Sequence, residues 1–210
     1  MKRILLAALL VLNLALPGAG HAAGGLYASP PPPGSAFVRV LNLGSAPIDV
    51  QLAGKSKAQK IGGGALGGYL YVAPGARTLT VAASSLELSL QSDSATTVIY
   101  DGTSLTPIAD SYSMDPGKAL IAFYNLTDKP LALKTVDGKH AIVEDIAHNQ
   151  MGTRLVNEIK IAFAAYAGGQ SVARFDEQFL KKGGTYSYVA IAKDGQVRTL
   201  SLPNAFDGLQ

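Results

Sequence analysis

Short stretches of the chain alternate apolar and polar residues with a period of two. Ile48, Val50 and Leu52 alternate with polar residues, and residues 86–91 and 159–164 show the same pattern. A period of two places the apolar side chains on one face of a β-strand. We therefore expect strands in all three stretches, including residues 158–166, which form the best candidate for a helix.

Turn signals separate these stretches. The pairs are Pro33-Gly34, Pro74-Gly75, Asp101-Gly102, Pro116-Gly117, Asp137-Gly138 and Asp194-Gly195. An Asp-Gly pair between alternating segments favours a β-hairpin, because both residues tolerate a positive φ. Short strands without a strand–helix–strand rhythm predict β-sandwiches.

One segment of the chain occurs twice. Residues 34–50 and 117–133 align without a gap, at a constant offset of 83 residues, and Gly, Ala, Asn, Leu and Pro recur in place. In each copy we expect the Asn (Asn42 or Asn125) to end a strand and bond its own turn. The Pro (Pro47 or Pro130) would open the next strand, where a missing N–H is tolerated. A single repeat of this length predicts two copies of a small domain.

The N-terminus has the pattern of a secretory signal peptide. Lys2 and Arg3 precede an apolar run of 13 residues, 4–16, which is followed by Pro17 and by small residues up to Ala23. This run is shorter than the roughly 20 residues that span a bilayer. We expect cleavage after Ala22 and export to the periplasm.

The predicted architecture is all-β, with two tandem small β-sandwich (Ig-like) domains. We divide the chain into a signal peptide at 1–22, an extended Pro-rich arm at 23–33, an N-terminal sandwich at 34–110 and a C-terminal sandwich at 111–210. The four prolines 30–33 favour a stiff polyproline II arm.

Charge and cysteine content exclude several functions. Removing Lys2 and Arg3 lowers the formal net charge from +3 to +1, with 16 basic against 15 acidic residues. No strong basic face for nucleic acid is evident in a nearly neutral chain. The chain has no cysteine, which rules out disulfides, Cys-ligated metals and Cys nucleophiles.

Candidate catalytic chemistry is sparse. Asp145 and His148 have the Asp-x-x-His spacing of acetylesterase-like serine hydrolases, and Asp101-Gly-Thr-Ser104 resembles their serine block. A triad requires these groups to converge on one rigid site, whereas Ser104 follows a hairpin-type pair. We therefore expect no catalytic residues and no enzyme, with a serine acetylesterase or acetyltransferase using Ser104, Asp145 and His148 as the alternative.

A metal or cofactor is likewise not expected. Glu144, Asp145 and His148 could supply oxygen and nitrogen ligands, but their spacing matches no recognised metal site. The candidate contacts with a partner or polymer are instead Tyr27, Arg39, Lys55, Lys57, Lys60, Lys181 and Lys182. Lysines of this kind also protect the edges of sheets from pairing, and we favour that interpretation over polymer binding.

Two blocks of the sequence resemble the AlgF family of alginate O-acetylation accessory proteins. The first block contains Leu26, Tyr27, Pro30 and residues 33–42. The second contains residues 118–120 and 125–139, with Asn125, Pro130, Asp137 and Gly138 in their places.

The resemblance implies a periplasmic, non-catalytic adaptor. Its partners would be periplasmic alginate acetyltransferases and the membrane acyltransferase complex of the inner membrane, which together acetylate the 2- and 3-hydroxyls of mannuronate residues. The alternative, drawn from the lysines, is a module that binds the anionic polysaccharide itself.

Overall fold

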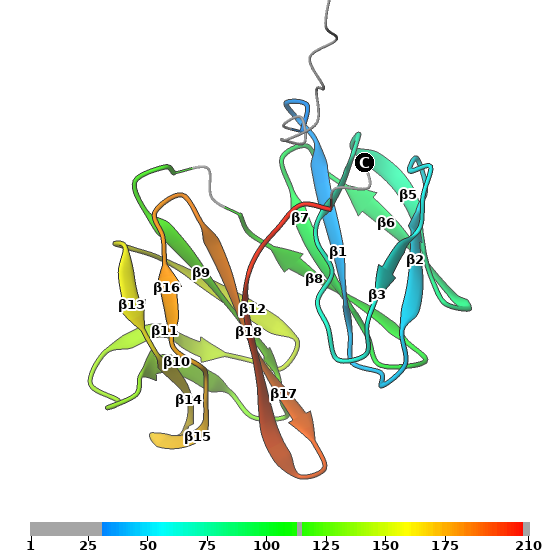
Figure 1. Ribbon diagram of the computed structural model, residues 1–210. Coiled ribbons are helices and arrows are strands. Elements are labelled where there is room, and N and C mark those ends of the chain that lie inside the picture. The colour runs from blue at the N-terminus through cyan, green and yellow to red at the C-terminus, as the bar shows by residue number, and fades with distance from the viewer. Residues whose placement is uncertain (1–30, 113–114, 208–210) are drawn as a thin grey trace, which may run out of the picture. The chain divides into compact units, whose positions relative to one another are not determined.

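The computed structural model describes residues 31–112 and 115–207. The predicted signal peptide, Tyr27 and most of the Pro-rich arm lie outside these residues. Every regular element of the described part is a β-strand (Figure 1). Within these residues, no helix is long and apolar enough to cross a bilayer.

The strands form two β-sandwiches, which confirms the predicted fold class. The first contains β1 (Ala36–Asn42), β2 (Ile48–Leu52), β3 (Gln59–Ile61), β4 (Leu70–Val72), β5 (Gly75–Val81), β6 (Ser84–Leu90), β7 (Ala95–Tyr100) and β8 (Leu105–Asp110). Its sheets have the orders β4-β1-β7-β8 and β3-β2-β5-β6. Val38, Val50, Leu79 and Val98 meet between these sheets in one buried cluster.

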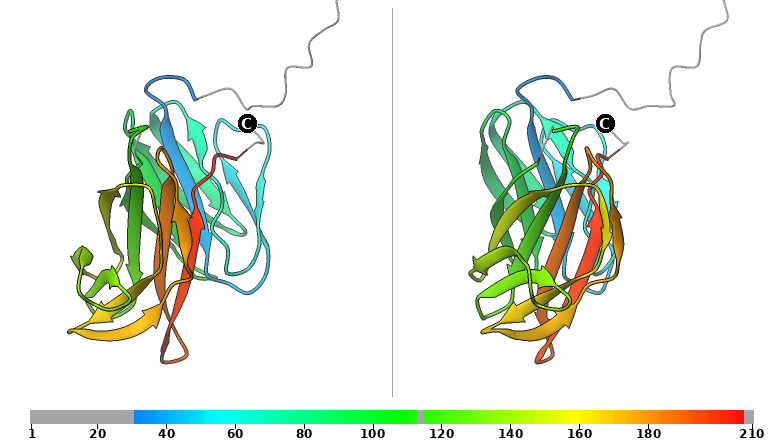
Figure 2. Two further views of the ribbon diagram at one scale, coloured as in Figure 1. Left: turned by 60° about the vertical axis from the view of Figure 1, so that its left-hand side comes forward. Right: turned by 90° about the vertical axis from the view of Figure 1, so that its left-hand side faces the viewer.

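The second sandwich repeats this plan. It contains β9 (Ala119–Leu126), β10 (Leu131–Thr135), β11 (Ala141–Ile146), β12 (Gln150–Val156), β13 (Ile159–Ile161), β14 (Phe163–Ala167), β15 (Gln170–Arg174), β16 (Gln178–Leu180), β17 (Thr185–Lys193) and β18 (Gln196–Pro203). Its sheets have the orders β12-β9-β17-β18 and β11-β10-β14-β15, with β13 and β16 as a separate pair. Figure 2 shows these strands from two further sides.

The repeated asparagines make matching hydrogen bonds, as predicted. The side-chain amide of Asn42 donates to the carbonyls of Ala46 and Gly62, and its oxygen accepts from the Gly44 N–H. Asn125 donates to Lys129 and Ile146 and accepts from the Thr127 N–H. Each asparagine is fully buried, so each ties the end of its strand to the following turn.

The Asp-Gly pairs stand in hairpins, as predicted. They join β7 to β8, β10 to β11 and β17 to β18, all antiparallel. At Asp194-Gly195 both residues have a positive φ, 53° and 75°. At Asp101-Gly102 and Asp137-Gly138 the glycine alone does, so the expected two-residue turn geometry occurs in one of the three hairpins.

The prediction of a single strand over residues 159–164 was wrong in detail. Two strands meet there: β13 pairs with β16, and β14 pairs with β10. Phe163 is buried, whereas Ile159 is 44% exposed. The two strands belong to different sheets, so the alternating residues do not share one face.

The first strand of each repeat is buried on both faces. Val38 and Val40 of β1 point into the first core, while Leu41 joins a cluster with Tyr124 of β9 and Val189 of β17. Both β1 and β9 are buried at every position. Each also pairs in parallel with a late strand of its own sandwich, β1 with β7 and β9 with β17. No pattern in the sequence indicates this parallel pairing.

Residues near the C-terminus return to the first sandwich. Tyr69 and Phe206 form a β-bridge, and the Tyr69 N–H donates to the carbonyl of Ala205. The side chain of Gln59 also hydrogen-bonds Asp207. The strands thus divide at residues 110–119, but the segment after β18 packs against the first half of the chain.

Candidate functional site

A buried ion pair occupies the surface where β1 and β8 meet β9 and β17. Nη2 of Arg39 lies 3.1 Å from Oδ2 of Asp110, and neither side chain is more than 1% exposed. Nε of Arg39 donates to Thr97 at 2.9 Å, and Nη2 also donates to the Tyr124 hydroxyl at 2.7 Å and to Ser187 at 2.9 Å. The buried, positively charged guanidinium of Arg39 therefore hydrogen-bonds residues of both sandwiches.

Asp110 is surrounded by hydroxyl donors. Tyr69, Thr97 and Tyr124 all donate to its carboxylate. Burial raises the pKa of Tyr69 and of Tyr124 above the ordinary value, so both phenols stay protonated and remain donors. The guanidinium carbon of Arg39 also lies 4.3 Å from the centre of the Tyr69 ring.

This cluster is an internal connection. The expectation that Arg39 contacts a partner or a polymer needs correction, because the side chain is enclosed and its donors are directed at protein atoms. A buried charge with these hydrogen bonds fixes the geometry between two elements. Arg39 is thus a structural residue.

The candidate triad residues are not joined to one another. Ser104 is exposed in the β7–β8 turn, where its N–H donates to Asp101. Asp145 lies in β11, and Nδ1 of His148 is 2.8 Å from the carbonyl of Thr127. Among the described residues, no hydrogen bond links any two of Ser104, Asp145 and His148. The arrangement that a nucleophile and its base require is therefore not formed.

Glu144, Asp145 and His148 do not gather as metal ligands either. Within residues 31–112 and 115–207, no three His, Asp or Glu side chains lie together so that they could hold a metal ion. Glu144 and Asp145 are exposed neighbours in β11. Asp145 has a φ of 53° and lies where the pairing of β10 with β11 shifts register, so its position reflects an irregularity of the strand.

The first group of lysines lies around β3. Lys60 pairs with Asp49 at 2.9 Å, both well exposed, and Lys57 is exposed in the preceding loop. Nζ of Lys55 lies 4.0 Å from the centre of the Tyr71 ring, and partial burial lowers its pKa. Tyr71, Lys55 and Arg77 line one open groove of about 360 Å³. Since β3 is an edge strand, Lys60 is placed to protect that edge.

Lys181 and Lys182 follow β16 in an exposed turn. The backbone N–H of Lys181 donates to the Tyr186 hydroxyl, and that of Lys182 donates to Glu158. Their side chains are exposed. They lie in a different sandwich from the lysines around β3, so the two groups of lysines do not belong to one element. Tyr27 lies outside the described residues.

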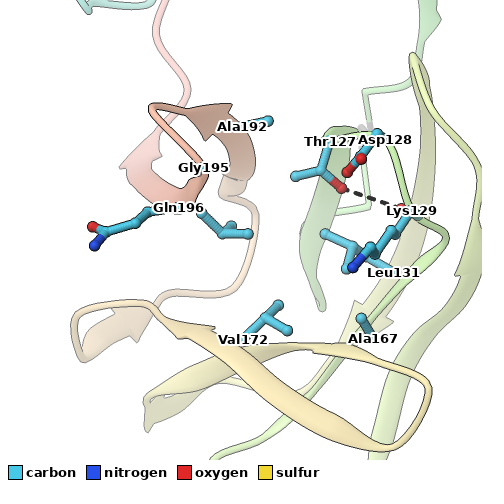
Figure 3. A pocket seen from close by; sticks show the side chains of 10 residues that line it. Thr127, Asp128, Lys129, Leu131, Ala167, Val172, Ala192, Gly195 and Gln196 are labelled. Carbon is cyan, nitrogen blue, oxygen red and sulfur yellow. Dashed lines mark hydrogen bonds between the residues drawn. The ribbon is translucent and has the colours of Figure 1, made fainter.

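A hollow that the sequence analysis did not predict lies at one end of the second sandwich (Figure 3). It has a volume of about 590 Å³ and lies between the β9–β10 turn, the β14–β15 hairpin and the β17–β18 hairpin. Leu131, Ala167, Val172, Ala192 and Val197 are its apolar lining residues. The sequence signal for this hollow is the different length of the β7–β8 and β17–β18 turns. Both turns lie outside the aligned residues 34–50 and 117–133.

Comparison with known proteins identifies the family. The family model described as "Alginate O-acetyl transferase AlgF" matches residues 9–187. The chain belongs to the AlgF family. The match includes both repeated segments, the Arg39–Asp110 pair and the first three residues of β17, so the AlgF family pattern includes strands of both sandwiches.

AlgF relatives are similar over most of their length. A protein named "Alginate biosynthesis protein AlgF" from Pseudomonas aeruginosa is 31% identical over 179 residues, which are 85% of this chain and 82% of the relative. A protein of the same name from Pseudomonas putida is 32% identical over 159 residues, covering 75% of this chain and 74% of the relative.

Two solved structures of AlgF domains are also similar. The C-terminal domain of AlgF from P. aeruginosa is 27% identical, with a TM-score of 0.39, and the match covers 42% of this chain and 99% of that one. The N-terminal domain of the same protein is 28% identical, with a TM-score of 0.34, and the match covers 39% of this chain and 100% of that one.

Proposed function

We propose that this chain is a non-catalytic periplasmic adaptor in the O-acetylation of alginate. It would connect the acyl-transferring membrane complex to periplasmic acetyltransferases that modify mannuronate residues. Membership of the AlgF family, whose relatives are named for alginate biosynthesis, supports the pathway. Export by residues 1–22 would deliver the chain to that compartment.

The observation that carries the adaptor role is that the candidate catalytic and buried polar groups form hydrogen bonds within the protein and not with one another as a catalytic site would require. The buried cluster around Arg39 and Asp110 directs its donors at protein atoms. His148 is bonded to a backbone carbonyl, and Ser104 is bonded through its backbone in a turn of the other sandwich. The family description names an acetyl transferase; we assign the transfer step to the partners, and to this chain the task of holding them.

Deleting this protein and measuring polymer yield and acetyl content separately tests the proposal. We expect polymer to be retained and its acetyl groups to be lost, with acetylation restored by the wild-type chain. Ser104→Ala and His148→Ala should restore it equally well. The mature chain should also bind a purified periplasmic acetyltransferase at micromolar concentration. Loss of polymer itself, or failure to bind, would contradict the adaptor role.

A second candidate, binding of the anionic polymer, has one observation in its favour. Lys55 and Arg77 share a groove with the Tyr71 ring, and a uronate chain could meet both positive charges there. This reading predicts alginate binding that weakens as salt rises and weakens further in Lys55→Ala. Salt-independent or absent binding would exclude it and leave the adaptor role unaffected.

A further inference from the structure

The turn that corresponds to the one beside the hollow of the second sandwich is longer in the first sandwich. There the β7–β8 turn contains four residues, 101–104, between the paired residues Tyr100 and Leu105. This turn reaches the neighbouring hairpin, because Oγ of Ser84 donates to the carbonyl of Thr103 at 2.9 Å. The matching β17–β18 turn has two residues, Asp194 and Gly195. The shorter turn leaves the space that Figure 3 shows between Gly195, Val172 and Leu131.

The strand beside this hollow has a free edge. β18 is the last strand of its sheet and pairs with β17 alone among the described strands. Lys193 lies opposite Gln196 across the two-residue turn. In that register the backbone N–H and C=O of Gln196 and Arg198 point to β17, and those of Val197 point outward. Val197 also lines the hollow, so two unpaired backbone groups lie at its rim.

The opposite rim is closed to strand pairing. The pairing of β14 with β15 shifts register between Ala165 and Tyr166, which leaves Val172 as the extra residue of a bulge. Bulges disrupt the pairing of edge strands. Val172 lines the hollow and is 38% exposed. Farther along β18, Oγ1 of Thr199 donates to the carbonyl of Arg174 at the end of β15, so this hydrogen bond connects the two strands there. The available pairing site is therefore short and centred on Val197.

The lining determines the chemistry of the occupant. Asp128 and Lys129 are its charged residues, and their charges cancel. Thr127 and Gln196 add uncharged polar groups, the other lining residues are aliphatic or glycine, and no aromatic ring lies among them. A polyuronate would gain neither charge attraction nor stacking here. An extended peptide would gain backbone hydrogen bonds at Val197 and burial of an apolar side chain against Leu131 and Val172.

We propose that a short extended segment of the partner acetyltransferase pairs with the backbone of Val197 and inserts one aliphatic side chain into this hollow. The inference rests on the proposed adaptor function and names the surface that performs it. It also gives a reason for the difference between the repeats: the second sandwich has a two-residue turn where the first has four residues, and the partner would fill the space beside the shorter turn.

Hydrogen exchange of the full mature chain, with and without a purified periplasmic acetyltransferase, tests the site. We expect the peptide spanning residues 192–199 to exchange at least about tenfold more slowly in the complex, because the Val197 N–H would become hydrogen-bonded. The β7–β8 turn of the first sandwich, residues 101–104, should exchange at an unchanged rate and is the internal control.

A pair of variants separates docking from folding. Val172→Asp introduces a charge into the hollow and should weaken binding by about tenfold or more, because it opposes burial of an apolar side chain. Ile159→Asp makes the same change at an exposed position of β13, outside the hollow, and should leave binding within about twofold. Thermal unfolding of both variants shows whether each is folded.

The outcomes distinguish this inference from the proposed function. If the transferase binds the wild-type chain but protects other residues, or binds Val172→Asp normally, docking at the hollow is overturned and the adaptor role stands. If the transferase does not bind at all, both fail. Protection of residues 192–199 by alginate alone would also overturn the docking site. So would protection by self-association, which a mass measurement by light scattering tests. Protection by residues 23–30 of the same chain would do the same, and a variant lacking those residues tests it.

Discussion

The two sandwiches share a plan and differ at one end. In both, a buried asparagine ties the first strand to its turn, and that strand pairs in parallel with a late strand. In the first, a four-residue turn hydrogen-bonds the neighbouring hairpin; in the second, a two-residue turn leaves a hollow. The repeated residues therefore build the fold, and the residues that differ decide which sandwich has an open surface.

The same contrast explains how the two copies join. Arg39 and Ala122 occupy matching positions of the repeat, as do Leu41 and Tyr124. The large cation of one copy stands where the other has a small residue, and the phenol of Tyr124 accepts from Arg39 while it donates to Asp110. The contact needs a cation on one side and a hydroxyl on the other, and the differing residues of the two copies supply one each.

The largest expected effect comes from removing the unmatched cation. Arg39→Met should lower the free energy of unfolding by about 3–5 kcal/mol, because it leaves the Asp110 carboxylate buried without its counter-ion. Urea denaturation measures this. Lys60→Met, which breaks an exposed pair with Asp49, is the control and should cost less than about 1 kcal/mol. Equal losses in the two variants would show that the buried pair has no special role.

Next in size is the loss of the repeated asparagine. Asn42→Ala and Asn125→Ala should each lower the free energy of unfolding by about 2–3 kcal/mol, because each leaves buried backbone groups without a partner. Asn125→Ala should cost slightly more, since Asn125 also accepts from the Thr127 hydroxyl. If one variant is neutral in urea denaturation, the two turns are not equivalent and the structural repeat is weaker than the matching bonds indicate.

The smallest effect on stability, and the sharpest on binding, should come from exchanging the turns. Replacing Asp194-Gly195 by the four residues Asp-Gly-Thr-Ser of positions 101–104 should narrow the hollow. Stability should change by less than about 1 kcal/mol, because the turn is exposed, and transferase binding should fall about tenfold. Titration by calorimetry measures the affinity. An unchanged affinity would show that the length of the turn does not affect docking.

Local features of the fold could be predicted from the sequence. Alternation gave the strands around Ile48 and Leu88, and the recurring Asn and Pro gave the turns, because these features depend on neighbours in the chain. The parallel pairs and the burial of Arg39 could not be predicted. Arg39 meets Thr97 and Ser187, which are 58 and 148 residues away, and no local pattern reports such contacts.

The candidate site was harder to predict than the fold. Residue type alone suggests the lysines and the group of Ser104, Asp145 and His148, whereas the hollow arises from the length of a turn. Ser104 and His148 belong to turns of different sandwiches, so their resemblance to a hydrolase pattern does not extend to geometry. A turn that is shorter by two residues produces no motif in the sequence. The hollow therefore becomes evident only when the two sandwiches are compared in three dimensions.

The most direct test of the central claim, that this chain holds partners and makes no bonds itself, is the acetyl content of alginate per uronate residue, measured by proton NMR. The deletion strain would receive either Ser104→Ala/Asp145→Asn/His148→Ala or Val172→Asp. We predict normal acetylation with the triple variant and clearly reduced acetylation with Val172→Asp. Loss of acetylation in a folded triple variant, with Val172→Asp normal, would contradict the account.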